Sequence, residues 1–119
     1  MPHKSILIVD DEALVRRTAR SLLSEFVDSC HEAENGQQAL EQVKKLKPDL
    51  VLLDISMPVM NGLQAAYEIR RLAPSTKIIF FTVDGSGDAR MAAHALGVAA
   101  FVTKSEGPEL IQTVKRLLA

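Results

Sequence analysis

The sequence predicts an α/β fold in which helices cover both faces of a doubly wound, five-stranded parallel sheet. Short apolar runs without polar alternation recur along the chain, and such runs are typical of strands buried on both sides. Amphipathic helical patterns fill the intervals between these runs, so strands and helices alternate. Five strand-helix units of this kind build an open sheet with right-handed crossovers.

The predicted strands are the apolar runs at residues 6–9, 50–53, 78–81 and 99–102, with a weaker run at 30–33. Helical spacing defines five helix faces: Val15, Ala19, Leu22 and Phe26; Ala39, Leu40, Val43 and Leu46; Gly62, Ala66, Ile69 and Ala73; Met91, Ala92, Ala95 and Leu96; Leu110, Ile111, Val114, Leu117 and Leu118. Pro48 and Pro74 are expected to end the second and third helices. We expect Gly97 to cap the fourth helix, and Gly107 with Pro108 to open the fifth.

Length and composition limit what the chain can be. Its 119 residues fit one domain, which we expect to span residues 1–119. The net charge is −1 and no basic run exceeds two residues, so this domain is not expected to contact nucleic acid. The single cysteine, Cys30, cannot form an internal disulfide, which fits a reducing, cytoplasmic compartment. No apolar run is long enough to span a membrane.

Polar side chains follow four of the predicted strands. Asp10 and Asp11 come after the first strand, Asp54 after the third, Thr82 after the fourth and Lys104 after the fifth. In doubly wound sheets the functional crevice lies beyond the carboxyl ends of the strands, so these side chains are expected to converge. A lone aspartate there is more often a helix cap, but one cap does not explain three carboxylates. A carboxylate cluster with one lysine is a hard-oxygen site that suits Mg²⁺.

Four motifs make the chain resemble the receiver domain of two-component response regulators over essentially its whole length. They are VDDE after the first strand, LLDISMPVMNG around the third, FFT at the fourth and AAFVTK at the fifth. The second motif is the most specific, because it combines an aspartate with Met57, Pro58 and Gly62 at the family's spacing. The resemblance implies a flavodoxin-like fold with strand order 2-1-3-4-5. It also implies a phosphoacceptor regulatory domain rather than an enzyme that acts on other substrates.

The resemblance implies a role for each carboxylate. Asp54 is expected to accept a phosphoryl group from the phosphohistidine of a sensor histidine kinase or a phosphotransfer protein. Mg²⁺ is expected to bind Asp11, Asp54 and the backbone carbonyl of Ser56, with Asp10 orienting bound water. A divalent cation and an ammonium supply the charge neutralisation that phosphoryl transfer needs, and the cation makes the proximity of the carboxylates tolerable.

The resemblance also implies a switch. Lys104 is expected to pair with Asp54 and then with the phosphoryl oxygens, while Thr82 donates a hydrogen bond to one of them. Phe101 falls on the family's aromatic switch position, and movement of Thr82 toward the phosphoryl group would vacate space for its ring. The surface expected to change comprises the fourth helix, the fifth strand and the fifth helix. A partner or a second copy is expected to bind there.

The segment TKSEGP resembles receivers that are attached to helix-turn-helix transcription factors. We therefore favour the receiver part of a longer transcription regulator over a stand-alone, single-domain regulator. In that reading, contact with DNA belongs to an output domain outside this chain.

Two positions depart from the family's pattern. The residue after Lys104 is commonly proline with a cis bond, whereas here it is Ser105, and a cis bond before serine would cost about 2.5–4 kcal/mol. Val83 is branched where the family often has a small residue, which narrows access to the site. Met60 and Met91 are expected to be packing residues rather than ligands.

Rival protein classes share parts of the pattern. A flavodoxin-like or nucleotide-binding protein needs a Gly-rich or Ser/Thr-rich loop after the first strand to cradle phosphate, whereas this chain has DDEA there. A phosphatase of the aspartyl-phosphate type has a second acid two residues after the nucleophile, where this chain has Ser56. A degenerate receiver that only binds partners would lack part of the site, but the full set of strand-end residues is present.

Overall fold

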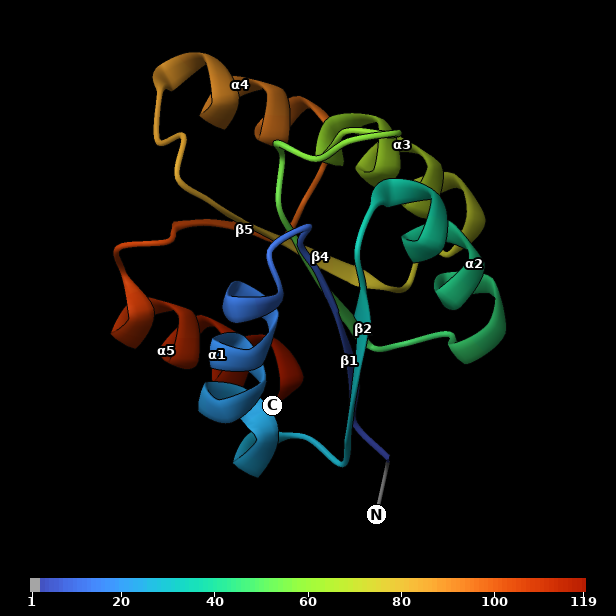
Figure 1. Ribbon diagram of the computed structural model, residues 1–119, viewed down its shortest axis with the longest axis vertical. Helices are drawn as coiled ribbons and strands as arrows, with labels where there is room; N and C mark the ends of the chain where they lie inside the picture. Colours follow the sequence, from blue (N-terminus) through green and yellow to red (C-terminus); the bar gives the residue numbers. More distant parts are fainter. Residues whose placement is uncertain (1–2) are drawn as a thin grey trace.

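Five parallel strands form one sheet in the computed structural model, which describes residues 3–119 (Figure 1). The strands are β1 (Ser5–Val9), β2 (Ser29–Ala33), β3 (Leu50–Leu53), β4 (Lys77–Thr82) and β5 (Ala100–Thr103), in the order β2-β1-β3-β4-β5. All four strand pairings are parallel. The predicted fold class and strand order are therefore confirmed, and each predicted strand bound is correct to within one residue.

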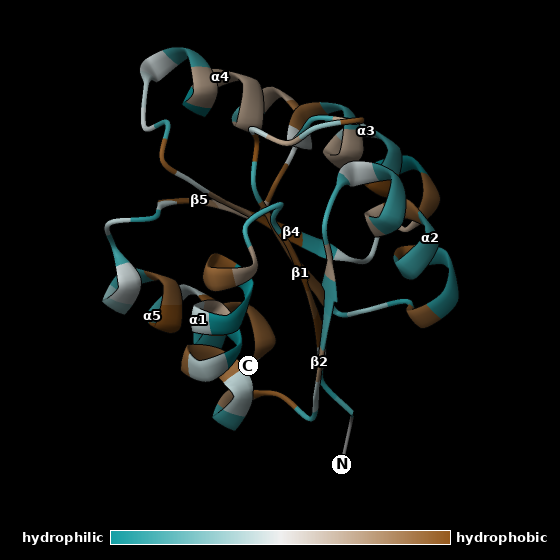
Figure 2. Cartoon of the chain, in the orientation of Figure 1, coloured by the Kyte–Doolittle hydropathy of each residue, from teal (hydrophilic) through white to brown (hydrophobic). Residues whose placement is uncertain are grey.

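Helices cover both faces of this sheet. α1 (Ala13–Leu23) and α5 (Gly107–Leu118) lie on one face, and α2 (Gly36–Leu46), α3 (Gly62–Leu72) and α4 (Gly87–Ala95) lie on the other (Figure 1). The central strands are the most hydrophobic segments, and polar residues alternate with apolar ones along the helices (Figure 2). Every residue of β1 and β3 is buried, which explains why neither strand shows polar alternation.

The strands divide the core into two halves because successive side chains point to opposite faces. Leu7, Leu53 and Phe80 pack beneath α2, α3 and α4. Ile8 and Leu52 pack beneath α1 and α5, together with Ala19 and Leu23 of α1 and Leu110 and Val114 of α5. The two half-cores hold the strands rigidly and so fix the positions of the residues that follow each strand.

The first helix is shorter than its apolar spacing predicts. α1 ends at Leu23, and Ser24–Phe26 continue as a single 3-10 turn, so Phe26 lies beyond the helix. The buried residues of α1 are Ala19 and Leu23, while Val15 and Leu22 are partly buried at the edge of the core.

The predicted packing face of the fourth helix is wrong except at Leu96, which packs against the core. Ala89 and Ala93 are the buried residues of α4, whereas Met91 is 73% exposed and Ala95 is also exposed. Met91 is therefore not a packing residue, although Met60 does pack against the core. Small apolar residues occur all round this helix, so apolar spacing alone does not distinguish its buried face from its exposed one.

The predicted cap of the fourth helix is confirmed. Gly97 has a φ of 72°, a left-handed conformation that favours glycine, and its amide donates to the carbonyl of His94. Among residues 3–119, Lys47 and Val59 also have positive φ values. Val59 follows the third strand in an exposed loop, and a branched residue is a steric outlier in this conformation.

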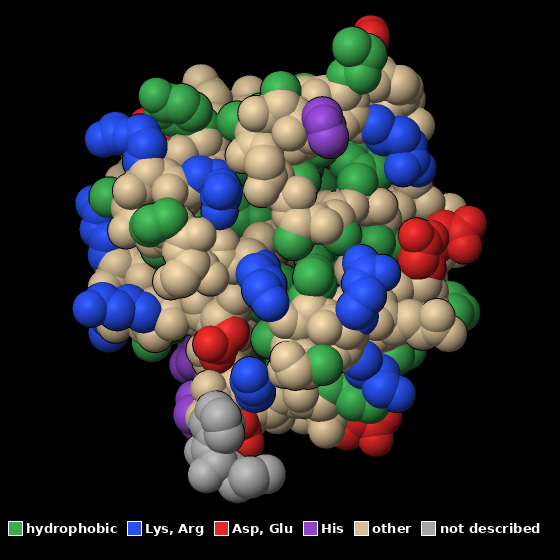
Figure 3. All heavy atoms as spheres, turned by 180° about the vertical axis from the view of Figure 1, so that it is seen from behind, with side chains coloured by type: hydrophobic (Ala, Val, Ile, Leu, Met, Phe, Trp, Pro, Cys, Tyr) green, Lys and Arg blue, Asp and Glu red, His purple; other side chains and the backbone are tan. Residues whose placement is uncertain are grey.

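Charged side chains are distributed over the surface that Figure 3 shows. Seen from behind, Lys and Arg side chains lie scattered among hydrophobic and uncharged ones rather than gathered in one patch (Figure 3). Within residues 3–119, none of the helices has the length and apolarity needed to cross a membrane.

Candidate functional site

The polar residues at the strand ends converge because the backbone ladder continues past each strand. The amide of Asp10 donates to the carbonyl of Ala33 at 3.2 Å, and the amide of Asp54 donates to the carbonyl of Val9 at 3.1 Å. The amide of Lys104 donates to the carbonyl of Thr82 at 2.9 Å. These bonds fix the main chain at each strand end, so the side chains that follow are held at one edge of the sheet.

Lys104 joins two of the carboxylates. Its Nζ lies 2.7 Å from Oδ2 of Asp10 and 3.3 Å from Oδ2 of Asp54. The carboxylates are 2% and 4% exposed, so this ammonium is the cation that compensates two buried negative charges. The expected pairing of Lys104 with Asp54 is present, but the shorter contact is with Asp10, which the sequence did not predict.

Protonation at the site reflects both burial and neighbouring charge. Burial raises the pKa of Asp54, and the charge of Asp10 raises it further, while Lys104 acts in the opposite direction. Burial disfavours the ammonium of Lys104, but the hydrogen bond to Asp10 and the charges of both carboxylates outweigh burial and raise the pKa of Lys104. The site without a metal is therefore short of positive charge, and an added cation would favour the ionised form of Asp54.

Three acidic side chains lie close together at the end of β1. One carboxylate oxygen from each of Asp10, Asp11 and Glu12 lies within 4.8 Å of the others. Asp10 is buried, whereas Asp11 and Glu12 are exposed. Asp54 does not belong to this group at that distance, and Glu12, which follows the pair in the sequence, was not predicted as a ligand. Its place directly after Asp11 was the sequence signal for this membership.

Two buried polar atoms at this edge make no hydrogen bond. They are Oδ1 of Asp54 and Oγ1 of Thr82, on the adjacent strands β3 and β4. Thr82 is fully buried and lies close enough to favour the charged form of Asp54 slightly, although no hydrogen bond joins them. A buried oxygen without a partner costs free energy unless a ligand satisfies it. A carboxylate oxygen beside an acidic group fits a hard divalent cation, and a hydroxyl donor fits an anionic oxygen.

A glycine allows the end of the loop after Asp54 to lie against the start of that loop. The amide of Gly62 donates to the carbonyl of Ile55 at 2.8 Å, and a Cβ at Gly62 would lie 2.0 Å from the carbonyl oxygen of Asp54. The backbone approach at Gly62 is therefore too close for any other side chain without a shift of the loop. Ser56 lies in the same loop and is exposed, and the use of its carbonyl as a ligand stays a prediction. Residues 3–119 contain no cis peptide bond, so the bond between Lys104 and Ser105 is trans.

The proposed switch residues lie on one face of the sheet, beneath α4. Phe80 and Phe101 are cross-strand neighbours whose ring centroids are 6.4 Å apart in an edge-on arrangement. Thr82 is two residues beyond Phe80 and therefore points to the same face. The guanidinium of Arg90 lies 4.6 Å from the centroid of the Phe101 ring, a cation-π contact that the sequence did not predict.

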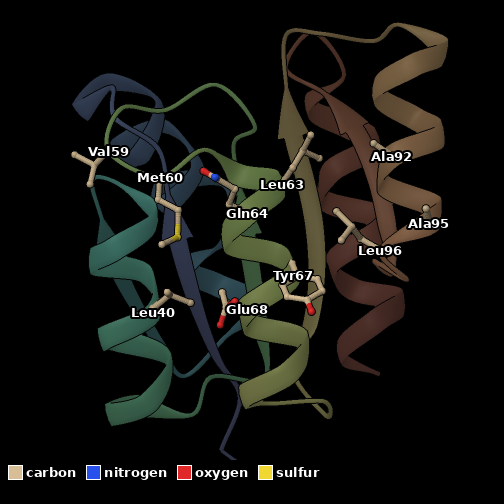
Figure 4. A pocket seen from close by; sticks show the side chains of 10 residues that line it. All are labelled: Leu40, Val59, Met60, Leu63, Gln64, Tyr67, Glu68, Ala92, Ala95 and Leu96. Atoms are coloured by element: carbon tan, nitrogen blue, oxygen red, sulfur yellow. The ribbon is translucent and has the colours of Figure 1, made fainter.

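Other hollows lie at different places on the molecule. An open groove of about 820 Å³ runs over α3, between α2 and α4, and its lining includes Met60, Tyr67 and Leu96 (Figure 4). None of the strand-end residues lines it. A smaller hollow of about 290 Å³ lies between α1 and the start of α5 and reaches Lys104. Leu14, which is 69% exposed, lines this smaller hollow.

Comparison with known proteins agrees with the geometry. The sequence model of the response regulator receiver domain matches residues 6–115. The chain belongs to the response regulator receiver family. Receivers are regulatory domains of two-component systems that interact with histidine kinases or phosphotransfer proteins and bind Mg²⁺ through an acidic pocket.

The curated relatives of this receiver fall into two groups by length. A chemotaxis protein CheY from Halobacterium salinarum is 34% identical over 116 residues, which are 97% of each chain. A protein-glutamate methylesterase/protein-glutamine glutaminase from Methanococcoides burtonii is 35% identical over 115 residues. Those residues are 94% of this receiver but 33% of the methylesterase, so the chain spans about one third of such relatives.

Solved structures resemble the receiver along nearly its whole length. The response regulator TrrA of Thermotoga maritima, solved in complex with Mg²⁺ and BeF, is 37% identical, with a TM-score of 0.85 and coverage of 96% of this chain and 98% of that one. A DNA-binding response regulator of the LuxR family from Staphylococcus aureus is 28% identical, with a TM-score of 0.89. The alignment of the two covers 98% of this chain and 99% of the Staphylococcus aureus protein's chain.

Proposed function

We propose that residues 1–119 act as a phosphoacceptor domain in which Asp54 receives the phosphoryl group. A carboxylate oxygen of Asp54 forms a bond to phosphorus while the bond between phosphorus and the imidazole nitrogen of a phosphohistidine breaks, and the released imidazole takes a proton from water. The observation that supports this role most directly is Oδ1 of Asp54, a buried carboxylate oxygen without a partner at the edge where the functional residues converge.

The residues that would hold Mg²⁺ are Asp10, Asp11 and Asp54, with the backbone carbonyl of Ser56. When bound, Mg²⁺ neutralises charge on the transferred oxygens. Three observations support this assignment: the close-set oxygens of the acidic group, the unpaired oxygen of Asp54 and the shortage of positive charge at the site. Glu12 is an additional candidate in the acidic group, because its carboxylate lies beside that of Asp11.

Lys104 and Thr82 would act on the phosphoryl group after transfer. Lys104 already contacts the Asp54 carboxylate at 3.3 Å, so a small displacement of its flexible side chain reaches a group attached to that carboxylate. Thr82 has a free hydroxyl on the neighbouring strand and can donate it to a phosphoryl oxygen. These two donors would compensate the charge that Asp54 gains.

A protein partner would reach the site over α1. Leu14 is an exposed leucine one turn from the acidic group, and the hollow that it lines continues to Lys104. Exposed apolar residues beside a polar site favour recognition by another protein. We propose that the donor, a histidine kinase or a phosphotransfer protein, contacts this region while its phosphohistidine meets Asp54.

The output is proposed to be control of transcription through the surface formed by α4, β5 and α5. Thr82 and Phe101 share one face of the sheet beneath α4, so displacement of Thr82 can be transmitted to the Phe101 ring and to that surface. The likeness to a DNA-binding response regulator supports this output. The likeness to chemotaxis protein CheY supports the alternative, a signal passed on by the domain alone through the same surface.

The test is incubation with a small phosphodonor, with Mg²⁺ or with a chelator, followed by measurement of the intact mass. The expected result is the addition of one phosphoryl group, with Mg²⁺ only. Asp54→Asn should not gain mass, whereas Glu41→Gln, which alters an exposed acid on α2, should behave as the wild type. An equal mass gain in Asp54→Asn would exclude Asp54 as the acceptor.

A further inference from the structure

A partly buried arginine binds the loop that contains the acidic group. Arg16 lies on α1, and its side chain is only 12% exposed. Its Nη1 donates to the backbone carbonyl of Asp10 at 2.7 Å, and its Nε donates to Oε1 of Glu32 at 3.0 Å. Its Nη2 lies 3.8 Å from a carboxylate oxygen of Glu34. The planar guanidinium thus links the loop after β1 to β2 and to the segment that follows it.

The loop before α1 is not held by a side-chain cap at the start of the helix. Glu12 is the N-cap residue of α1, but its side chain makes no capping hydrogen bond. Glu12 instead donates its amide to Oδ1 of Asp10 at 3.0 Å, and Oδ2 of Asp10 binds Lys104. With the contact from Arg16, the amide, the carbonyl and both carboxylate oxygens of Asp10 are all engaged. The neighbouring carboxylates of Asp11 and Glu12 are therefore placed by a single anchored residue.

Two carboxylates, those of Glu32 and Glu34, lie beside the positive charge of Arg16. Glu32 accepts hydrogen bonds from both Arg16 and Arg20, and Glu34 lies beside Arg16. Because two carboxylates neutralise the guanidinium locally, its main effect on the acidic group is positional rather than a long-range attraction. Arg20 is more exposed than Arg16, and it donates to the carbonyl of Cys30 on β2 where Arg16 donates to the carbonyl of Asp10 in the loop after β1.

We propose that Arg16 is a positioning residue that holds Asp10 and Asp11 in the arrangement required for Mg²⁺. This inference rests on the proposed function, since it assumes that the acidic group binds the cation. Residues that orient metal ligands from behind typically change metal affinity about 10- to 100-fold when they are replaced. We expect a loss of about 10-fold for Arg16→Ala, because Lys104 and the Glu12 amide still hold the side chain of Asp10.

The experiment compares Mg²⁺ dissociation constants, measured by calorimetric titration, for the wild type, Arg16→Ala, Arg16→Lys and Arg20→Ala. Arg16→Ala should weaken Mg²⁺ binding about 10-fold, and Arg16→Lys, which keeps the charge and can donate to one partner, should recover part of the loss. Arg20→Ala also removes a hydrogen bond to Glu32 but should stay within about twofold of the wild type. Amide exchange of the metal-free protein should be faster at Glu12 in the Arg16 variants and unchanged in Arg20→Ala.

Each other outcome has a definite meaning. A dissociation constant unchanged in both Arg16 variants, or raised equally by Arg20→Ala, would overturn the positioning role while leaving the proposed function intact. If Arg16→Ala does not fold, Arg16→Lys decides the question, because a loss in that variant without faster exchange at Glu12 would also overturn the role. A wild type that does not bind Mg²⁺ would overturn both the proposed metal site and this inference.

Discussion

Lys104 contacts Asp10 more closely than it contacts Asp54: its Nζ lies 2.7 Å from Oδ2 of Asp10 and 3.3 Å from Oδ2 of Asp54. In the protein without metal, Lys104 is therefore the internal counterion of two buried carboxylates. The contact has two consequences. It stabilises the fold when Mg²⁺ is absent, and it places an ammonium where it competes with Mg²⁺ for the same carboxylates.

The first prediction concerns this competition. Lys104→Met should lower the free energy of unfolding by about 3 kcal/mol in the presence of a chelator, because it leaves the buried carboxylates of Asp10 and Asp54 without a cationic partner. The same variant should bind Mg²⁺ more tightly than the wild type. Urea unfolding with and without Mg²⁺ measures both effects. The matched control is Lys77→Met, an exposed lysine that binds the carbonyl of Leu117, and it should leave the Mg²⁺ response unchanged. Weaker Mg²⁺ binding in Lys104→Met would show that the ammonium does not compete.

The second prediction concerns the acidic group. At about ten times its dissociation constant, Mg²⁺ should stabilise the wild type by roughly 1.4 kcal/mol through mass action. Asp11→Ala removes one of the repelling carboxylates, so the metal-free protein should be as stable as the wild type or more stable, and the Mg²⁺ response should be smaller. Thermal unfolding at several Mg²⁺ concentrations checks this. If Asp11→Ala kept the full response, Mg²⁺ would have to bind elsewhere.

The third prediction concerns the loop after Asp54. Gly62→Ala should destabilise the fold by about 2–3 kcal/mol, since the new Cβ would lie 2.0 Å from a backbone oxygen and the loop would have to shift. Gly87→Ala, at the start of α4, is the control, because a Cβ there meets nothing within 4 Å. Its free energy of unfolding should change by less than about 0.5 kcal/mol. Equal unfolding midpoints for the two variants would contradict the close approach at Gly62.

The fourth prediction concerns the switch. The contact of Arg90 with the Phe101 ring holds that ring in its present position, so Arg90→Gln should let the ring move without phosphorylation. NMR shifts in α4 and β5 of the unphosphorylated variant should then move part of the way toward the values that the wild type reaches with Mg²⁺ and a phosphoryl mimic. The control is Lys115→Gln, which removes the contact with Phe26 and should leave these signals in place. If the mimic shifts only signals near Asp54 in the wild type, the switch through Phe101 is wrong.

The fold could be predicted because the central strands are buried on both faces. Strands such as Leu50–Leu53 then appear as continuous apolar runs. Because the carboxyl ends of parallel strands lie at one edge of the sheet, the sequence alone also predicts that Asp10, Asp54 and Lys104 meet there. What the sequence could not specify depends on side-chain distances. Spacing does not reveal that Lys104 favours Asp10 or that Arg16 binds a backbone carbonyl in the loop.

The errors have a common physical cause. Met91 was assigned to the core because it is apolar, but α4 is rich in small apolar residues and turns Ala89 and Ala93 inward instead. Phe26 was assigned to the first helix because its spacing continues the helical period, yet the chain tightens after Leu23 into a 3-10 turn that includes Phe26. In both segments tertiary packing, rather than local periodicity, determines which side chain is buried.

The most direct test of the account identifies the residue that accepts the phosphoryl group. The protein is phosphorylated with a small phosphodonor and Mg²⁺ and then treated with borohydride, which reduces an aspartyl phosphate to homoserine. Peptide mass spectrometry locates the change. The account predicts homoserine at position 54, dependent on Mg²⁺ and absent from Asp54→Asn. Homoserine at position 10 or 11, or no homoserine in a protein that has gained a phosphoryl group, would contradict it.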